Sequence, residues 1–101
     1  MEYRIIVSPM QETLEIVFSR ANNKVDMSKV NTGSLGLIQG RMIDMIAAAD
    51  IAQKAVNVTV CDVRGSCPQN MILIAILGDT SAVENAMASV KEGVKRGSAN
   101  A

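Results

Sequence analysis

The two cysteines are the residues of this chain best suited to binding a metal ion or an iron–sulfur cluster. Cys67 lies in a turn formed by residues 64–68, and no second cysteine stands at a chelating spacing from it. Structural zinc and iron–sulfur clusters usually take about four protein ligands. A single thiol per chain therefore becomes such a site only if symmetry gathers several copies around one axis.

The turn around Cys67 has a sequence that favours a tight, exposed conformation. Gly65 permits a sharp turn, and Pro68 biases Cys67 toward extended backbone. The alternative is that Cys67 is a small loop residue without a role. Cys61 falls in an apolar stretch beside Asp62, so we expect a buried and unreactive thiol there.

Composition excludes several classes of function. The chain has 101 residues and no histidine, which removes the commonest general base and every triad that depends on imidazole. Ten basic and ten acidic residues are scattered and cancel, and Tyr3 and Phe18 are the only aromatic residues, so nucleic-acid binding is not expected. The start of the chain lacks the features of a signal peptide, and its longest apolar run, 71–77, is too short to span a bilayer. We therefore expect a cytoplasmic protein that does not enter membranes.

The elements that position the cysteines can be predicted from periodicity. Residues 3–7 alternate and predict a strand with Tyr3, Ile5 and Val7 on one buried face. Ser8 is the predicted cap of a following helix, with Pro9 at its first position and Gln11 as the capping-box partner. The predicted apolar face of that helix comprises Leu14, Val17, Phe18 and Ala21, although residues 13–18 would also suit a strand.

The middle of the chain predicts a loop, a strand, a long helix and a strand pair. Residues 22–32 are polar, and 33–39 form a short strand that Gly40 ends. A helix is expected from Arg41, with an apolar face of Met42, Met45, Ile46, Ala49, Ala52 and Val56. Residues 58–63 and 71–77 are predicted strands joined by the loop that carries Cys67.

A last helix is expected after residue 80. Ser81 and Glu84 form a second capping box, and Lys95, Arg96 and Gly97 suit the C-terminal end. Its predicted apolar face comprises Val83, Ala86, Met87, Val90 and Val94. The resulting fold class is α+β, with helices packed on an antiparallel-rich sheet and a ferredoxin-like βαββα core.

The segment from Gly33 to Val94 resembles the shell proteins of bacterial microcompartments. The residues that carry the resemblance are Gly36-Leu37-Ile38, Ala47-Ala48-Ala49-Asp50, Lys54-Ala55-Val56-Asn57-Val58, Gly65-Ser66, Gly78-Asp79 and Ala82-Val83. A strand and a helix precede this segment, so the chain is similar to the circularly permuted branch of the family. We expect one permuted domain over 1–101, made of a strand and short helix (1–21), a linker (22–32), the core (33–96) and a tail (97–101).

The resemblance implies a cyclic homohexamer that tiles with other microcompartment shell proteins around enclosed enzymes, and a structural rather than enzymatic role. It implies a narrow pore on the six-fold axis, lined by Arg64, Gly65, Ser66, Cys67 and Pro68. Lys54 is expected at the hexamer edge, where it helps hexamers tile. The alternative is that Lys54 has no role beyond an ion pair with Asp50, one helical turn earlier. Ser8 stands where the family usually has an arginine, which implies weaker or different tiling.

A cysteine in this loop is similar to what is seen in shell proteins of glycyl-radical-enzyme microcompartments. The resemblance therefore implies a [4Fe-4S] cluster on the axis, held by Cys67. Six symmetry-related thiolates would face a cluster that accepts four, so we expect only some subunits to ligate it. Two other interpretations stay open, a small ferredoxin-like regulatory or ligand-binding oligomer, and a dedicated electron carrier with one cluster per chain.

Overall fold

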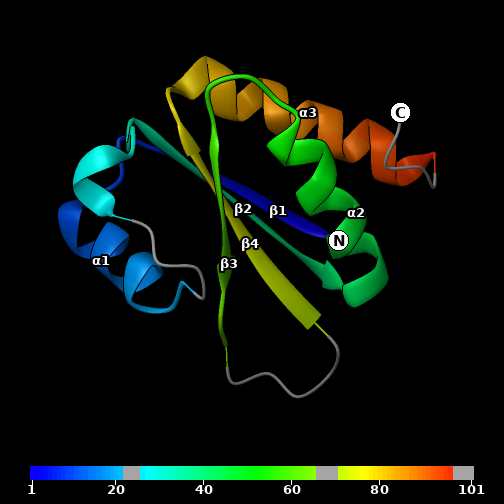
Figure 1. The fold of residues 1–101 in the computed structure, drawn as a ribbon, viewed down its shortest axis with the longest axis horizontal. Helices are drawn as coiled ribbons and strands as arrows, with labels where there is room; N and C mark the ends of the chain where they lie inside the picture. The colour runs from blue at the N-terminus through cyan, green and yellow to red at the C-terminus, as the bar shows by residue number, and fades with distance from the viewer. Residues whose placement is uncertain (22–25, 66–70, 97–101) are drawn as a thin grey trace.

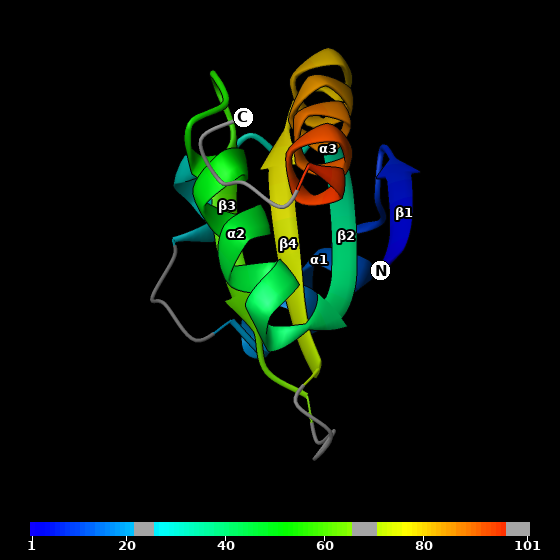
Figure 2. The same cartoon turned by 90° about the vertical axis from the view of Figure 1, so that its right-hand side faces the viewer.

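The computed structural model describes residues 1–21, 26–65 and 71–96. Four strands form one antiparallel sheet in the order β1-β2-β4-β3 (Figures 1 and 2). The elements in chain order are β1 (Glu2–Val7), α1 (Gln11–Ser19), a 3-10 turn (Met27–Lys29), β2 (Ser34–Arg41), α2 (Met42–Gln53), β3 (Thr59–Val63), β4 (Met71–Gly78) and α3 (Thr80–Lys95). The predicted α+β class with an antiparallel sheet is confirmed.

The helices cover both faces of the sheet. In Figure 2, α2 and α3 lie side by side in front of the strands, and α1 lies behind them. The larger core lies under α2 and α3 and contains Ile38, Met45, Ala48, Ile51, Ala52, Ile74, Ile76, Val83, Ala86, Met87 and Val90. The smaller core lies under α1 and contains Leu14, Val17, Leu35, Cys61, Val63, Ala75 and Leu77. The sheet is therefore the middle layer of the molecule.

Strand β1 is an edge strand, and its predicted buried face is covered only at Tyr3. Tyr3 packs against the larger core, but Ile5 is 39% exposed and Val7 is 59% exposed. Ile6, on the opposite face, packs partly against the smaller core. A strand at the edge of a sheet has a neighbour on one side only, so alternation alone does not tell how far the covering helices extend over it.

Helix α1 begins later than predicted and without the predicted cap. Its N-cap residue is Met10, whose side chain makes no capping hydrogen bond. Ser8 has a φ of 50°, in the left-handed region, and its backbone N–H donates to the carbonyl of Gly33 at 2.9 Å. This turn separates Ser8 from the helix and makes the predicted capping box wrong. The burial of Leu14 and Val17 is as predicted.

Strand β2 and helix α2 also differ from expectation in detail. Gly40 does not end β2, which continues to Arg41. The residues of α2 that face the core are Met45, Ala48, Ile51 and Ala52, whereas the exposed fractions of Met42 and Ile46 are 47% and 62%. Val56 lies beyond the helix and is 76% exposed. The predicted face was therefore right for Met45, Ala49 and Ala52 but wrong for the other three residues. Most of α2 is apolar, so periodicity did not single out one side.

Helix α3 has the predicted core face but a different cap. Val83, Ala86, Met87 and Val90 are buried, as expected. The N-cap is Asp79 rather than Ser81, and the Asp79 side chain accepts a hydrogen bond from the backbone N–H of Ala82. The N-cap of the helix therefore lies two residues before the predicted one.

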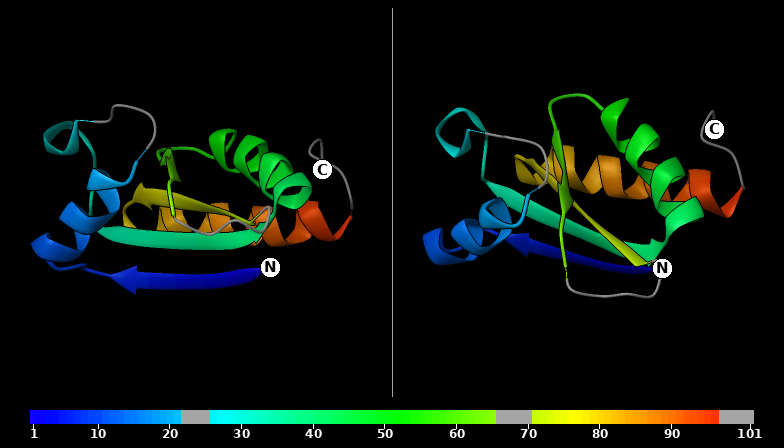
Figure 3. Two further views of the ribbon diagram at one scale, coloured as in Figure 1. Left: turned by 90° about the horizontal axis from the view of Figure 1, so that it is seen from below. Right: turned by 60° about the horizontal axis from the view of Figure 1, so that its bottom comes forward.

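Part of the sheet face on the α1 side forms a shallow hollow. It has a volume of about 180 Å³ and is lined by Glu2, Arg4, Leu37, Gln39 and Leu73. Gln39 donates a hydrogen bond to Glu2 across the β1-β2 pair, at 3.1 Å. Figure 3 shows α1 near one end of the sheet, whereas α2 and α3 lie along the other face. The two faces of the molecule therefore differ in both shape and chemistry.

Candidate functional site

The predicted pore segment leaves the sheet at the end of β3. Arg64 and Gly65 follow this strand, and both are exposed. The backbone N–H of Arg64 donates to the carbonyl oxygen of Arg20 at 2.7 Å, and an isolated bridge joins Ala21 to Val63. The first residues of the segment are therefore fixed to the end of α1. Sequence reasoning missed this contact because it joins residues far apart in the chain.

Ser66, Cys67 and Pro68 lie outside the described residues. The strands on either side fix where their segment connects, because Val63 is paired with Leu73 and Met71 is paired with Arg41. The segment thus joins β3 to β4 at the end of the sheet where β2 runs into α2 (Figure 1). The roles predicted for these three residues stay predictions.

Cys61 lies in the smaller core. Its exposed fraction is 0%, and its neighbours there include Leu14, Leu35 and Ala75. Burial raises the pKa of the Cys61 thiol above its ordinary value of 9.0, which disfavours the thiolate that metals bind. The predicted burial is confirmed. Within residues 1–21, 26–65 and 71–96, no three Cys, Asp or Glu side chains gather into a possible metal site.

Lys54 stands at the C-terminal end of α2, at the opposite end of the sheet from residues 64 and 65 (Figure 1). Its Nζ lies 2.7 Å from Oδ2 of Asp50, one helical turn earlier. The two side chains are 58% and 46% exposed. The ion pair with Asp50 therefore forms, and it leaves Lys54 on the surface, where an edge role stays a prediction.

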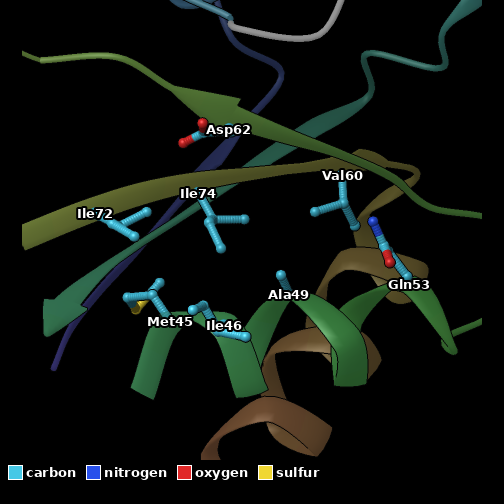
Figure 4. Close-up of a pocket in the computed structure, with 8 residues that line it drawn as sticks. All are labelled: Met45, Ile46, Ala49, Gln53, Val60, Asp62, Ile72 and Ile74. Atoms are coloured by element: carbon cyan, nitrogen blue, oxygen red, sulfur yellow. The ribbon is translucent and has the colours of Figure 1, made fainter. Parts of the chain in front are cut away.

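A groove between α2 and the edge of the sheet was not foreseen from the sequence. Its volume is about 560 Å³, and its lining is mostly apolar, from Met45, Ile46, Ala49, Gln53, Val60, Asp62, Ile72 and Ile74. Figure 4 shows the α2 side chains facing those of β3 and β4 across the groove. Asp62 is the charged residue in this lining.

The exposed side of α2 continues the apolar surface of the groove. Met42, Ile43 and Ile46 are 47%, 78% and 62% exposed. The sequence contained a signal for this surface, because α2 is apolar on nearly all of its sides. One sheet can bury only one side of such a helix, so the other apolar side needs a further partner. A surface of this kind marks an interface more often than a solvent-facing side.

None of the described helices is long and apolar enough to cross a bilayer. The chain therefore shows no α-helical membrane span within the described ranges.

Comparison with known proteins identifies the family. The family model of the BMC domain matches residues 34–100. The GrpU microcompartment shell protein from Clostridiales bacterium 1_7_47FAA, solved in a ligand-free structure, is 50% identical over 90% of this chain and 88% of its own, with a TM-score of 0.70. The ligand-free GrpU shell protein from Pectobacterium wasabiae is 28% identical over 89% of this chain and 99% of its own, with a TM-score of 0.73.

A third structure, of the CutR flat hexamer, is 25% identical over 90% of this chain and 72% of its own, with a TM-score of 0.61. No curated protein matches the chain significantly. The family match spans more than half of the chain, and the GrpU similarity extends over nearly all of it. The chain belongs to the BMC-domain family and is a microcompartment shell protein.

Proposed function

We propose that this protein is a structural, non-enzymatic shell subunit that assembles into a cyclic hexamer. The observation that carries the proposal is the similarity to GrpU shell proteins over nine-tenths of the chain. The flat hexamer of CutR, which shares the fold, supports the six-fold form. Other shell proteins are the proposed partners of the hexamer, and the enclosed enzymes would lie behind the shell.

The arrangement of the elements supports a ring with residues 64–68 at its axis. Arg64 and Gly65, the described residues of this segment, follow β3 at one end of the sheet, and Lys54 stands at the other end (Figure 1). In a flat ring, one end of each subunit points to the axis and the other to the rim. The proposed pore and the proposed tiling residue therefore occupy opposite ends of the subunit, as the two roles require.

The order of elements supports a circular permutation. The matched segment begins at residue 34, whereas β1 and α1 precede it. Strand β1 pairs along its whole length with β2, from Glu2 opposite Gln39 to Val7 opposite Ser34. The strand at the start of the chain thus completes the sheet of the domain. We propose that residues 1–101 form a single permuted domain.

We further propose that Cys67 holds a [4Fe-4S] cluster on the axis of the hexamer. The chain contains two cysteines, and Cys61 is buried in the smaller core, so Cys67 is the thiol that remains for a shared site. One thiol per subunit fits a cluster only when several subunits converge. A cluster there would supply one-electron redox chemistry across the shell. With no cluster, the same axis would serve as a pore for small solutes.

Iron and sulfide content per hexamer tests the cluster. Protein purified or reconstituted without oxygen is expected to be brown and to contain iron and sulfide in equal amounts. Cys67→Ser should lose the colour and the iron while keeping the hexamer. Cys61→Ser is the matched control and should keep both. Colour that survives Cys67→Ser, or that depends on Cys61, would overturn the assignment of the ligand.

Subunit number tests the shell assignment separately. Light scattering should show hexamers, and electron microscopy should show them laid edge to edge in flat layers. A trimer that binds a small molecule between subunits would instead support a ligand-binding oligomer. A monomer carrying a whole cluster would support a dedicated electron carrier.

A further inference from the structure

Two groups of large apolar side chains are exposed on the side of the sheet that carries α2 and α3. The first, the α2 group, consists of Met42 and Ile46. The second, the β1 group, consists of Ile5 and Val7. Removing apolar side chains from water is favourable in proportion to their area. A partner that covered either group would therefore be held there by the hydrophobic effect.

The α2 group continues into the apolar groove beside β3. Ile46 and Ala49 form one wall of the groove, and Val60 lies in the opposite wall (Figure 4). Met42 stands one helical turn before Ile46, so the two side chains are neighbours on the helix surface. Asp62 does not lack a partner within its own subunit. The groove therefore calls for a cover because of its apolar surface and not because of its carboxylate.

The β1 group lies in the same layer of the molecule as the groove. Tyr3 packs against the larger core, under α2 and α3. Side chains two residues apart on a strand point to the same face of the sheet, so Ile5 and Val7 share this face with Tyr3. Their exposure shows that α3 covers little of this edge. Both apolar groups therefore belong to the layer formed by α2 and α3.

The two groups stand on opposite sides of the subunit. Strands β1 and β3 are the two edges of the sheet, and α2 lies on the β3 side of α3 (Figure 2). A cyclic ring is built from heterologous contacts, in which one side of a subunit meets the opposite side of the next. Rotation about the ring axis keeps the layer of α2 and α3 on one side of the ring. In the proposed hexamer, the α2 group of each copy would thus meet the β1 group of its neighbour.

Strand register places the β1 group at the level of the groove. Ile5 pairs with Gly36, Gly36 pairs with Ile76, and Ile76 pairs with Val60. This row across the sheet starts at an exposed residue of the β1 edge and ends in the wall of the groove. Neighbours in a ring touch at points that lie equally far from the axis. Ile5 of one copy would therefore reach the groove of the next copy.

Side chains, and not a sheet that continues from subunit to subunit, would make this contact. Val63, the last residue of β3, forms a bridge with Ala21, and the backbone N–H of Arg64 donates to the carbonyl oxygen of Arg20. Residues of the same chain thus occupy this part of the β3 edge. A neighbouring strand could not pair there, whereas the groove above the edge stays open to side chains.

We propose that a second copy of this chain covers the groove, with Ile5 of that copy seated between Ile46 and Val60. Val7 of the same copy packs beside it, farther along α2. The inference rests on the proposed hexamer and names the contact that closes it. Apolar side chains buried at the centre of the contact supply most of the affinity, and the polar residues around them form its rim.

Charged substitutions at these exposed positions test the contact. Ile46→Lys and Ile5→Glu should each weaken assembly roughly 30-fold or more, as expected for residues at the centre of an interface. The two new side chains have opposite charges, so the double variant should lose less than the product of the two single losses. Mass photometry over a dilution series measures the hexamer fraction, and circular dichroism verifies the fold.

Ile16 on α1 provides a matched control for Ile46. Its exposed fraction is 61%, against 62% for Ile46, and it lies on the helix at the other face of the sheet (Figure 2). Ile16→Lys should therefore assemble like the wild type. An equal loss of assembly in Ile16→Lys and Ile46→Lys would mean that an added lysine acts without regard to place, and the contact would be rejected.

Cross-linking provides a test that does not depend on the charged variants being well behaved. Ile5→Cys and Ile46→Cys are combined with Cys67→Ser. Ile5 lies on the β1 edge and Ile46 on the β3 side, and three strand spacings, or ~14 Å, separate these edges. A disulfide bridges only ~7 Å between α-carbons. Oxidation should therefore yield a ladder of covalent oligomers up to six copies, and no ladder when either new cysteine is absent.

The outcomes separate this inference from the proposed function. Wild-type protein that is not hexameric overturns the hexamer itself. Hexameric wild type whose assembly is unchanged by Ile46→Lys and Ile5→Glu, or whose double variant loses the full product of the single effects, overturns the contact of Ile5 with the groove alone. A missing ladder in a hexameric double-cysteine protein does the same.

Discussion

The side chain of Asp79 accepts a hydrogen bond from the backbone N–H of Ala82 at 2.8 Å and so caps helix α3. Ser81 does not cap the helix, and its hydroxyl donates to the same carboxylate at 3.1 Å. Asp79→Ala should therefore lower the free energy of unfolding by about 1 kcal/mol, because an exposed N–H of the first turn loses its partner. Urea denaturation at fixed protein concentration measures the change.

Two controls make this prediction specific. Asp79→Asn keeps an oxygen acceptor and should retain most of the stability. Ser81→Ala should change it by only a few tenths of a kcal/mol. A larger loss for Ser81→Ala than for Asp79→Ala would mean that the serine is the cap after all.

Gly36 on β2 lies closely under α3. A Cβ at this position would be 2.8 Å from Cε of Met87 and 3.0 Å from Cγ1 of Val83. Gly36→Ala should destabilise the protein by about 1–3 kcal/mol through overpacking. Met87→Ala creates room, so the double variant should lose less stability than the sum of the two single variants. Additive losses would show that the Met87 side chain had already moved aside.

The buried thiol of Cys61 makes stability depend on alkaline pH. Because burial raises its pKa in the folded state, the unfolded chain loses this proton first as the pH rises past the ordinary value of 9.0. The contribution of the thiol is therefore complete below about pH 9 and is lost as the pH rises toward its folded pKa. The free energies of unfolding of wild type and Cys61→Ala, measured by urea denaturation, should therefore differ by a constant amount up to about pH 9.

Above pH 9 the difference should shrink. The pKa of Tyr3 is also raised, by burial and by the charge of Asp44, but this group is common to both proteins and cancels in the comparison. A difference that stays constant up to pH 10 would contradict the burial of Cys61 as the cause.

The ion pair of Lys54 and Asp50 should matter more for tiling than for folding. Both side chains are about half exposed, so Lys54→Ala should lower stability by only about 0.3–0.5 kcal/mol. If Lys54 stands at the hexamer edge, the same change should reduce the formation of flat layers and leave the hexamer intact. Electron microscopy and light scattering measure the two effects.

Helix α3 offers a matched control for Lys54. Arg96 pairs with Glu92 at 2.9 Å, with the same helical spacing and similar exposure. Arg96→Ala should have the same small effect on stability and none on the layers. Equal effects of both variants on layer formation would remove the special role of Lys54.

Local patterns in the sequence predicted the helices and strands well, but they predicted less well which side of each element is buried. The face of α3 was correct because its polar and apolar positions are clearly separated, with Val83, Ala86 and Val90 on one side. The face of α2 was only partly correct, because Ile43 and Ile46 are as apolar as the buried Met45 and Ile51. Such a helix meets two apolar environments, and only the tertiary fold decides which residues face the subunit's own core.

In the candidate site too, some features could be predicted from local sequence and others depended on the tertiary fold. The burial of Cys61 followed from its apolar stretch, and the ion pair of Lys54 with Asp50 followed from their helical spacing. The contact of Arg64 with Arg20 depends on how β3 and the end of α1 meet in the fold, which no local pattern specifies. The chemistry predicted for Cys67 rested on family resemblance, and the iron and sulfide content of wild type and Cys67→Ser tests it.

The hollow on the α1 side of the sheet would give a layer of the proposed hexamers two unlike surfaces. In the proposed hexamer, rotation about one axis turns every subunit the same way up. The ring would then expose α2 and α3 on one side, and α1 with six copies of the hollow lined by Glu2, Arg4 and Gln39 on the other. A shell built from rings in one orientation would therefore have different inner and outer surfaces. The enclosed enzymes and the cytosol would each meet a different surface, and no further component would be needed to distinguish them.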